Sequence, residues 1–537
     1  MNLVCRKKDI FESEMESIVV PMYEGAQYLM LGNEIASALS AIINAGFFSD
    51  KEERIRNFFV TIMGETKKVY ALNITKEMNI LKTGESNIYG SDYDPHAVSG
   101  AFRALGATLG RALVKDNIKS VSILAFEDMW ATIKREQLKR FLDTKNEAVL
   151  STAAIVGGLL LSIYRYDMFK HEAKPIALQN IEVMTRRDDV MQFMDETSNH
   201  KWLELCRHVN IVRDLVNAPS NVLLPETFAE YVKTSSISSI AVDVLDENEL
   251  EEKGLQLVSA VGRGSVNKPR FIIMKYKGNH STARHIALVG KGVTFDSGGT
   301  NLKPSDAMDD MRCDMAGAAT VFGIVSMIAT MELPINVRAY IPLAENIIGG
   351  GAIHPGDIVR SYSGKTVEIL NTDAEGRLLL ADALSLAAET NPEYILDIAT
   401  LTGACSIALG DFCAGLFSNR RELSRLMLES SQWCGERVWE MPLVEEYLEQ
   451  IKGKGADLQN MSSIPRKGGA IIAGLFLREF VGSCPWVHLD IAGPGFLGIE
   501  HPVLGKNATG FGVRLIYDFI IRTHKRNARL QGGRIYI

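Results

Sequence analysis

Short apolar runs alternate with longer helical segments through the first third of the chain. Runs rich in β-branched and apolar residues predict strands, and they cover residues 17–23, 68–74, 120–126 and 176–183. Residues 97–115 and 148–166 are longer and rich in Ala and Leu, which predicts helices. An alternation of strands and helices is typical of α/β structure.

The pattern changes after residue 185. Residues 186–200 are charged and polar with few apolar positions, and they lead into a predicted helix over 201–216. We therefore expect an N-terminal α/β domain over 1–190, a linker helix over 191–215 and a C-terminal domain over 206–537. The alternative for the polar segment is a solvated helix inside one domain.

Later strands are nearly continuous apolar runs, and they cover residues 286–290, 339–344, 394–400 and 487–493. Helical segments such as 317–331 separate them. Strands without polar alternation are buried on both faces, which indicates a mainly parallel or mixed sheet covered by helices. The predicted fold class is α/β in two domains, because 537 residues exceed one ordinary core.

Composition narrows the function classes. A net charge of -7 disfavours nucleic acid as a partner, since phosphate backbones need a basic surface. The cysteines are scattered without a CxxC pair, which disfavours a disulfide framework or a cysteine zinc site. Residues 1–17 lack a secretory signal, and the longest apolar stretch, 153–164, is too short to span a bilayer. We expect a cytoplasmic protein with no membrane association.

The octet NTDAEGRL (residues 371–378) joins an apolar run to a Leu- and Ala-rich helix. If residues 366–370 form a strand and the chain stays extended, Asp373 and Glu375 face one spot at the carboxyl end of that strand. Ligands bind at that end of open α/β sheets. The alternative is a helix start with an Asp cap, a Glu in the first turn and a solvated Arg377.

A second polar segment, KGVTFDSGGTNLKP (residues 291–304), follows the strand at 286–290, and Asp314 lies shortly after it. Its glycines and lysines could suit phosphate, but GxxxxGK[ST] and GxGxxG are absent. Together with Asp373 and Glu375, the acids Asp296 and Asp314 would concentrate four negative charges. Two divalent cations would balance them, with Mg, Mn, Co or Zn all suited to oxygen ligands. None of the ten histidines lies in HExxH.

NTDAEGRL resembles the signature of the leucyl aminopeptidase (cytosol aminopeptidase) family. The segments GKGVTFDSGG, DMAGAA, ATLTGA, ADLQN and HLDIAG resemble the same family in the same order. The resemblance covers about residues 206–520, and the N-terminal part is similar only loosely. The sequence departs from relatives at TNLKP, at Cys313 and at GPGF (residues 493–496), which bears on side-chain preference.

The resemblance implies a two-metal exopeptidase with two divalent ions per subunit. The implied metal ligands are Lys291, Asp296, Asp314, Asp373 and Glu375. Asp296 and Glu375 would bridge the ions, and Lys291 would bind as the neutral amine, the alternative being a simple counter-ion. Lys303 would polarise the scissile carbonyl. Arg377 would hold bicarbonate, the general base that works with a metal-bridged hydroxide.

The same resemblance implies a substrate pocket and an assembly. The implied substrate-binding residues are Met311, Asn371, Thr400, Leu401, Gly403 and Ala492. An apolar pocket of medium size would favour N-terminal Leu or Met on short peptides. The family assembles as a homohexamer, a dimer of trimers. The competing hypotheses are a metal-dependent phosphohydrolase and a DNA-binding role.

Overall fold

The computed structural model describes residues 1–7, 13–22, 33–44, 47, 53–62, 64–75, 95–125, 144–173, 175–185, 199–464 and 467–530. The chain divides into two compact units. The first comprises Met1–Cys206 with Glu500–Gly505, and the second comprises Arg207–Ile499 with Lys506–Ile537. The boundary falls within helix α8 (Asn199–Asn217), where a helix over 201–216 was predicted.

A six-stranded sheet forms the first unit, in the order β1-β6-β5-β2-β4-β3. Its strands are β1 (Asn2–Lys7), β2 (Ser17–Met22), β3 (Ile55–Ile62), β4 (Glu65–Asn73), β5 (Ser120–Leu124) and β6 (Asn180–Thr185). Neighbours pair in parallel except β3 and β4. The predicted strands correspond to β2, β4, β5 and β6. Sequence reasoning missed β1 and β3, because polar residues interrupt the apolar pattern of both edge strands.

Helices α1 (Asn33–Asn44), α3 (Pro95–Lys115) and α6 (Thr144–Ser162) complete the described part of this unit. Helices α3 and α6 pack backbone against backbone at glycines. A Cβ added at Gly106 would lie 2.0 Å from the Ile155 carbonyl oxygen, and one at Gly158 would lie 2.0 Å from the Arg103 carbonyl oxygen. Only glycine therefore permits this approach.

The second unit contains the larger sheet, in the order β16-β15-β18-β14-β9-β11-β8-β7, with β10 paired to β11. Its strands are β7 (Ile240–Leu245), β8 (Arg270–Lys277), β9 (Ile286–Gly290), β10 (Gly292–Asp296), β11 (Asn336–Asn346), β14 (Ile395–Ala399), β15 (Cys413–Ser418), β16 (Arg437–Glu440) and β18 (Trp486–Asp490). The strands β9, β10, β11, β14 and β18 run parallel to one another. Their carboxyl ends therefore share one edge.

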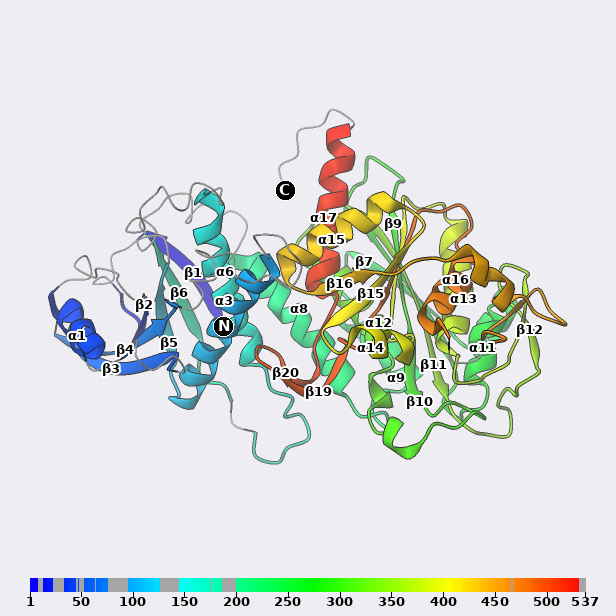
Figure 1. The fold of residues 1–537 in the computed structure, drawn as a ribbon, viewed down its shortest axis with the longest axis horizontal. Coiled ribbons are helices and arrows are strands. Elements are labelled where there is room, and N and C mark those ends of the chain that lie inside the picture. The colour runs from blue at the N-terminus through cyan, green and yellow to red at the C-terminus, as the bar shows by residue number, and fades with distance from the viewer. Residues whose placement is uncertain are drawn as a thin grey trace. The chain divides into compact units, whose positions relative to one another are not determined.

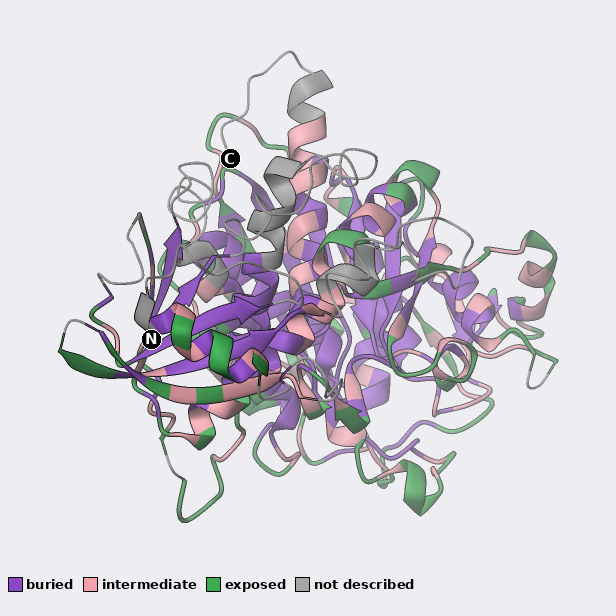
Figure 2. Cartoon of the chain, turned by 60° about the vertical axis from the view of Figure 1, so that its left-hand side comes forward, coloured by how far each residue is buried: buried purple, intermediate pink, exposed green. Residues whose placement is uncertain are grey.

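Helices cover both faces of this sheet. One set is α11 (Gln256–Gly262), α13 (Gly376–Glu389), α14 (Gly403–Leu409) and α16 (Gly469–Arg478), and the other is α9 (Pro225–Ser235), α12 (Ala316–Thr330), α15 (Arg421–Cys434) and α17 (Val513–Leu530). Figure 1 shows α13 and α16 on one side of the strands and α15 and α17 on the other. Strands β9, β14 and β18 are buried along their whole length, as expected from their unbroken apolar runs, and Figure 2 colours most strand residues inside the protein as buried. Other short elements include α10 (Glu247–Lys253) and the hairpin β19 (Phe496–His501) with β20 (Gly505–Ala508).

The strand before NTDAEGRL lies elsewhere than expected. Strand β13 (Thr366–Glu368) is shorter than predicted and joins a separate three-stranded sheet with β12 (Ile358–Arg360) and β17 (Leu458–Gln459). The octet therefore reaches the edge of the main sheet from outside it. Helix α13 begins at Gly376, as the Leu- and Ala-rich pattern predicted.

One segment among the described residues, Ser305–Thr330, is long and apolar enough to cross a membrane by length and composition. Its most apolar window is 94% buried inside the protein. It contains α12, which packs on strands β9, β11 and β14. The apolar character of this segment is that of a core helix.

Candidate metal centre

Parallel strands deliver polar side chains to the shared carboxyl edge. Lys291 directly follows β9, and Asp296 is the last residue of β10. Both are buried, with 3% and 2% of their surface exposed. Asn346 ends β11, and Thr400 follows β14. This is the edge of an open α/β sheet where ligands bind.

The NTDAEGRL segment reaches this edge as a turn. The Asn371 side chain accepts a hydrogen bond from the Asp373 amide at 2.8 Å, which forms a tight local turn. Glu375 has helical angles (φ -76°, ψ -36°) and occupies the N-cap of α13 without a side-chain capping bond. The extended geometry expected for this pair is therefore wrong, and so is the alternative in which an Asp caps the helix. The two acids meet the site because the chain turns between them.

Glycines let the segments approach closely. Gly298 has φ +86°, a conformation that favours glycine, and it lies beside the Asp373 carboxylate. A Cβ at Gly376 would lie 2.4 Å from the Lys291 side chain. The glycine of NTDAEGRL thus makes room for the lysine that follows β9.

Two lysines and four carboxylates converge here. The Lys291 ammonium lies 2.7 Å from Asp314 Oδ1 and 2.9 Å from Glu375 Oε1. The Lys303 ammonium lies 2.8 Å from Asp296 Oδ2 and 2.5 Å from Asp373 Oδ1. All the predicted ligands and the predicted catalytic lysine therefore lie in one cluster.

The pKa values of the acids and lysines in this cluster are shifted, because several charged groups are buried close together. Burial raises the pKa of Glu375 to about 8, and the Asp296 charge adds to the shift. Burial likewise raises the pKa of Asp314 to about 6, although Lys291 opposes this. Burial would lower the pKa of Lys291 and Lys303, but the neighbouring carboxylates outweigh it and hold both values above normal. Without metal, both lysines are ammonium ions that offset part of the charge of the four acids.

The donor set fits divalent cations. Carboxylate oxygens of Asp296, Asp314 and Glu375 all lie within 4.8 Å of one another. Asp314 Oδ2 and Glu375 Oε2 are buried and have no hydrogen-bond partner among the described residues. A buried carboxylate oxygen without a donor is costly, and a cation would satisfy it. An oxygen-rich set of this kind suits Mg, Mn or Zn.

Arg377 is the second residue of α13 and follows the turn along the chain. Its Nη1 donates to the Asn460 carbonyl oxygen at 2.7 Å, whereas its Nε is buried without a partner among the described residues. Burial lowers its pKa to about 10. At neutral pH the group is still a cation with an unused donor, so it can bind an anion.

The residues predicted to bind substrate differ in whether they bond directly to the charge cluster. The Thr400 hydroxyl donates to Asp314 Oδ1 at 2.7 Å, and the Thr400 carbonyl accepts from Lys291 at 2.9 Å. The amides of Leu401 and Ala492 both donate to Asp490, each at 3.2 Å. Asn371 lies within the NTDAEGRL turn. Met311 begins the short turn Met311–Cys313 before Asp314, and Gly403 begins α14.

Sequence reasoning missed the buried residues that hold the loops. Asn346 Nδ2 donates to Asp296 Oδ1 at 2.8 Å and to the Thr372 carbonyl at 3.0 Å. The Asn460 side chain accepts from the Leu370 amide and donates to the Asn371 carbonyl. Asn460 lies in the segment ADLQN and Asp490 in the segment HLDIAG. The resemblance of these two segments to the family was the sequence feature that could have pointed to both residues.

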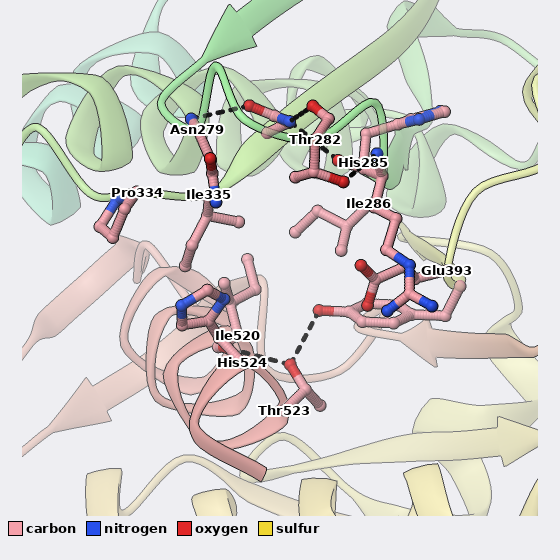
Figure 3. Close-up of a pocket in the computed structure, with 13 residues that line it drawn as sticks. Asn279, Thr282, His285, Ile286, Pro334, Ile335, Glu393, Ile520, Thr523 and His524 are labelled. Atoms are coloured by element: carbon pink, nitrogen blue, oxygen red, sulfur yellow. Dashed lines mark hydrogen bonds between the residues drawn. The ribbon is translucent and has the colours of Figure 1, made fainter. Parts of the chain in front are cut away.

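A separate cavity of about 50 Å³ lies at the opposite, amino-terminal ends of β9, β11 and β14 (Figure 3). His285, Glu393 and His524 are among its lining residues. Many of its polar groups bond to one another: Tyr394 with Thr523 at 3.1 Å, for example. The acid and lysine cluster is therefore the stronger candidate for chemistry.

Paired acids and lysines around a cation site at this edge are the construction of a metal-dependent hydrolase. The chain belongs to the cytosol aminopeptidase family, whose catalytic-domain model matches residues 210–517. The family comprises divalent-metal-dependent peptidases, so the protein is a metallo-aminopeptidase.

Relatives and solved structures agree with this assignment. The chain is 36% identical over 522 residues to a probable cytosol aminopeptidase of Aquifex aeolicus, covering 96% of this chain and 97% of the relative. It is 44% identical over 373 residues to one of Geotalea uraniireducens, covering 68% and 74%. A mutant of tomato leucine aminopeptidase superposes with a TM-score of 0.78 at 27% identity, covering 97% of this chain and 96% of that one. The bottromycin maturation enzyme BotP in complex with Mn superposes with a TM-score of 0.77 at 29% identity, covering 95% and 99%.

Proposed function

We propose that this protein is a leucyl-type aminopeptidase that releases N-terminal amino acids, Leu and Met preferred, from short peptides. The observation that carries the proposal is the convergence of Lys291, Lys303 and four carboxylates at one sheet edge, where Asp314 Oδ2 and Glu375 Oε2 have no hydrogen-bond partner among the described residues. The family membership supplies the reaction class.

The residues proposed to hold two divalent ions are Lys291, Asp296, Asp314, Asp373 and Glu375. When bound, the ions supply Lewis-acid activation of the scissile carbonyl and of the attacking water. Zn, Mn, Co and Mg all suit the donor set. Lys291 must lose its proton to become a ligand, which the positive charge of adjacent dications favours.

Lys303 and Arg377 are the proposed catalytic side chains. The Lys303 ammonium is 15% exposed, so it lies at the open side of the cluster, where it can donate to a developing oxyanion. Arg377 Nε, which has no hydrogen-bond partner among the described residues, would hold bicarbonate, and bicarbonate bound there would supply the general base. No histidine takes part in the described ion pairs of this cluster, which agrees with a base supplied from outside the chain.

The proposed substrate site accepts a free α-amine beside Asp314, which restricts cleavage to the N-terminus. Met311, Thr400, Gly403 and Ala492 would line an apolar pocket for the first side chain, while Asn371 and Leu401 would contact the peptide backbone. We further propose a cytoplasmic homohexamer, a dimer of trimers, with no nucleic-acid or membrane partner.

Replacement of the proposed carbonyl-polarising lysine tests this function. Lys303→Ala removes an oxyanion donor, and such a loss lowers turnover by roughly 100-fold to 1,000-fold. Lys365→Ala is the matched control, since Lys365 pairs with Glu479 in a partly exposed ion pair and contacts none of the proposed site residues. The assay is hydrolysis of a leucyl amide, with metal content measured for each variant.

Near-normal turnover in Lys303→Ala with full metal content would contradict the assignment. Hydrolysis of a phosphoester without hydrolysis of the leucyl amide by the wild-type protein would instead favour the phosphohydrolase.

A further inference from the structure

A single short loop connects β14 to α14; it carries the proposed substrate contacts Thr400 and Leu401, and a third, Gly403, begins the helix that follows. On its inner side, Thr400 bonds to Asp314 and Lys291 in the charge cluster. Those bonds fix only one residue of the loop. The positions of Leu401 and Thr402 depend on other contacts of the loop.

A buried carboxylate, Asp490, holds the outer side of this loop. It is the last residue of β18 and is 1% exposed. Its Oδ1 accepts from the amides of Leu401 at 3.2 Å and Thr402 at 3.4 Å. Its Oδ2 accepts from the Thr402 hydroxyl at 2.7 Å. The same Oδ1 accepts from the Ala492 amide at 3.2 Å, so one carboxylate joins two segments of the proposed pocket.

Through its bond to Thr402, Asp490 also contacts the residue that caps α14. Thr402 is the N-cap of that helix, and its hydroxyl oxygen accepts from the Cys405 amide at 3.1 Å. The hydroxyl therefore donates its only proton to Asp490 and uses its oxygen to cap the helix. An amide at position 490 would present a donor at one of its two positions, where the carboxylate accepts at both.

We propose that Asp490 is a positioning residue that sets the pocket for the first side chain of the substrate, an inference that rests on the proposed aminopeptidase function. It touches neither metal ligand nor reacting atom in the bonds described. Its hydrogen bonds act on the pocket through Leu401, Thr402 and Ala492. The loss of Asp490 therefore weakens substrate binding and side-chain discrimination more than it slows the chemical step.

The test compares Asp490→Asn with Thr402→Val, which removes the hydroxyl partner while keeping the side-chain shape. Glu436→Gln is the matched control: Glu436 is a buried carboxylate that accepts from the amides of Gly512 and Leu515 at the start of α17. This control variant changes another buried carboxylate, 4% exposed against 1% for Asp490, which holds a different helix and also pairs with Arg514 at 3.0 Å.

Kinetics on leucyl and alanyl amides give the first readout. Asp490→Asn and Thr402→Val should each raise KM for the leucyl amide by about tenfold, with kcat within about threefold, because uniform binding is lost. The preference for leucyl over alanyl amide should fall, and Mn affinity should match wild type. The control should change neither KM nor the preference. Wild-type KM and preference in Asp490→Asn would overturn the inference.

Hydrogen exchange gives a readout that does not depend on activity. Asp490→Asn should speed amide exchange in residues 400–409, whereas Glu436→Gln should not. Unchanged exchange in that segment would refute the anchoring role even if KM rose. A wild-type protein with no turnover on any amide refutes the proposed function, and the exchange result still decides whether Asp490 holds the loop.

Discussion

Removal of the Lys291 ammonium has a consequence that the structure specifies closely. In metal-free protein, Lys291→Met takes away the partner of Asp314 at 2.7 Å and of Glu375 at 2.9 Å, and the donor to the Thr400 carbonyl at 2.9 Å. Met keeps an unbranched apolar side chain that is one heavy atom shorter than Lys and lacks the ammonium. Both acids would remain buried without their partner. Loss of one partner from a buried ion pair costs about 3–5 kcal/mol in the free energy of unfolding.

The cost should depend on pH with a definite sign. Glu375 and Asp314 have folded pKa values of about 8 and about 6, above their ordinary values. A raised carboxyl pKa means that folding stability is present at low pH and is lost as pH rises through the folded pKa. Without Lys291, both pKa values rise further. The difference in the free energy of unfolding between Lys291→Met and wild type should therefore be small near about pH 5 and largest above about pH 8.

The assay is urea unfolding with chelator present, followed by tryptophan fluorescence at both pH values. Lys365→Met is the control, because the partly exposed pair with Glu479 is expected to contribute only about 0–1 kcal/mol. If Lys291→Met lowered the free energy of unfolding by less than about 1 kcal/mol, Lys291 would not be the buried counter-ion of the metal-free site. A decrease of equal size at both pH values would refute that role as well.

Two further predictions concern the residues that hold the loops and helices. Asn460→Ala should lower leucyl amide turnover by about 10-fold to 100-fold, because its side chain fixes Leu370 and Asn371 beside the cluster; wild-type turnover would contradict this. Gly106→Ala should destabilise the first unit by at least about 1–3 kcal/mol, because its Cβ would meet the α6 backbone. Gly100→Ala in the same helix, with open space at its Cβ, should be neutral or stabilising by up to about 1 kcal/mol in thermal unfolding. Equal effects of the two glycine variants would contradict the close packing.

Much of the fold followed from hydrophobic periodicity alone. The buried strands β9, β11, β14 and β18 were visible as apolar runs because both of their faces are covered. The small strand β13 was visible too, but its partners were not. Strand β17 lies about 90 residues further on, and two paired residues carry no periodic signal.

The sequence indicated which acids and lysines meet at this edge of the sheet, but not the geometry in which they meet. The acids and lysines of the two motifs converge as expected, because strand ends and a turn bring them together. The way Asp373 and Glu375 converge was wrong at the sequence level, since a turn set by Asn371 replaces an extended chain. Asn460 could not be assigned from sequence, because its role depends on tertiary hydrogen bonds to residues 370 and 371.

The most direct test of the central claim is metal reconstitution. Metal-stripped protein, shown to be folded, is assayed on a leucyl amide while Mn, Co, Zn or Mg is added back singly. The account predicts negligible hydrolysis without metal and restored hydrolysis with at least one of these ions. No hydrolysis with any ion would contradict a metal-dependent aminopeptidase, whatever the convergence of its acids and lysines.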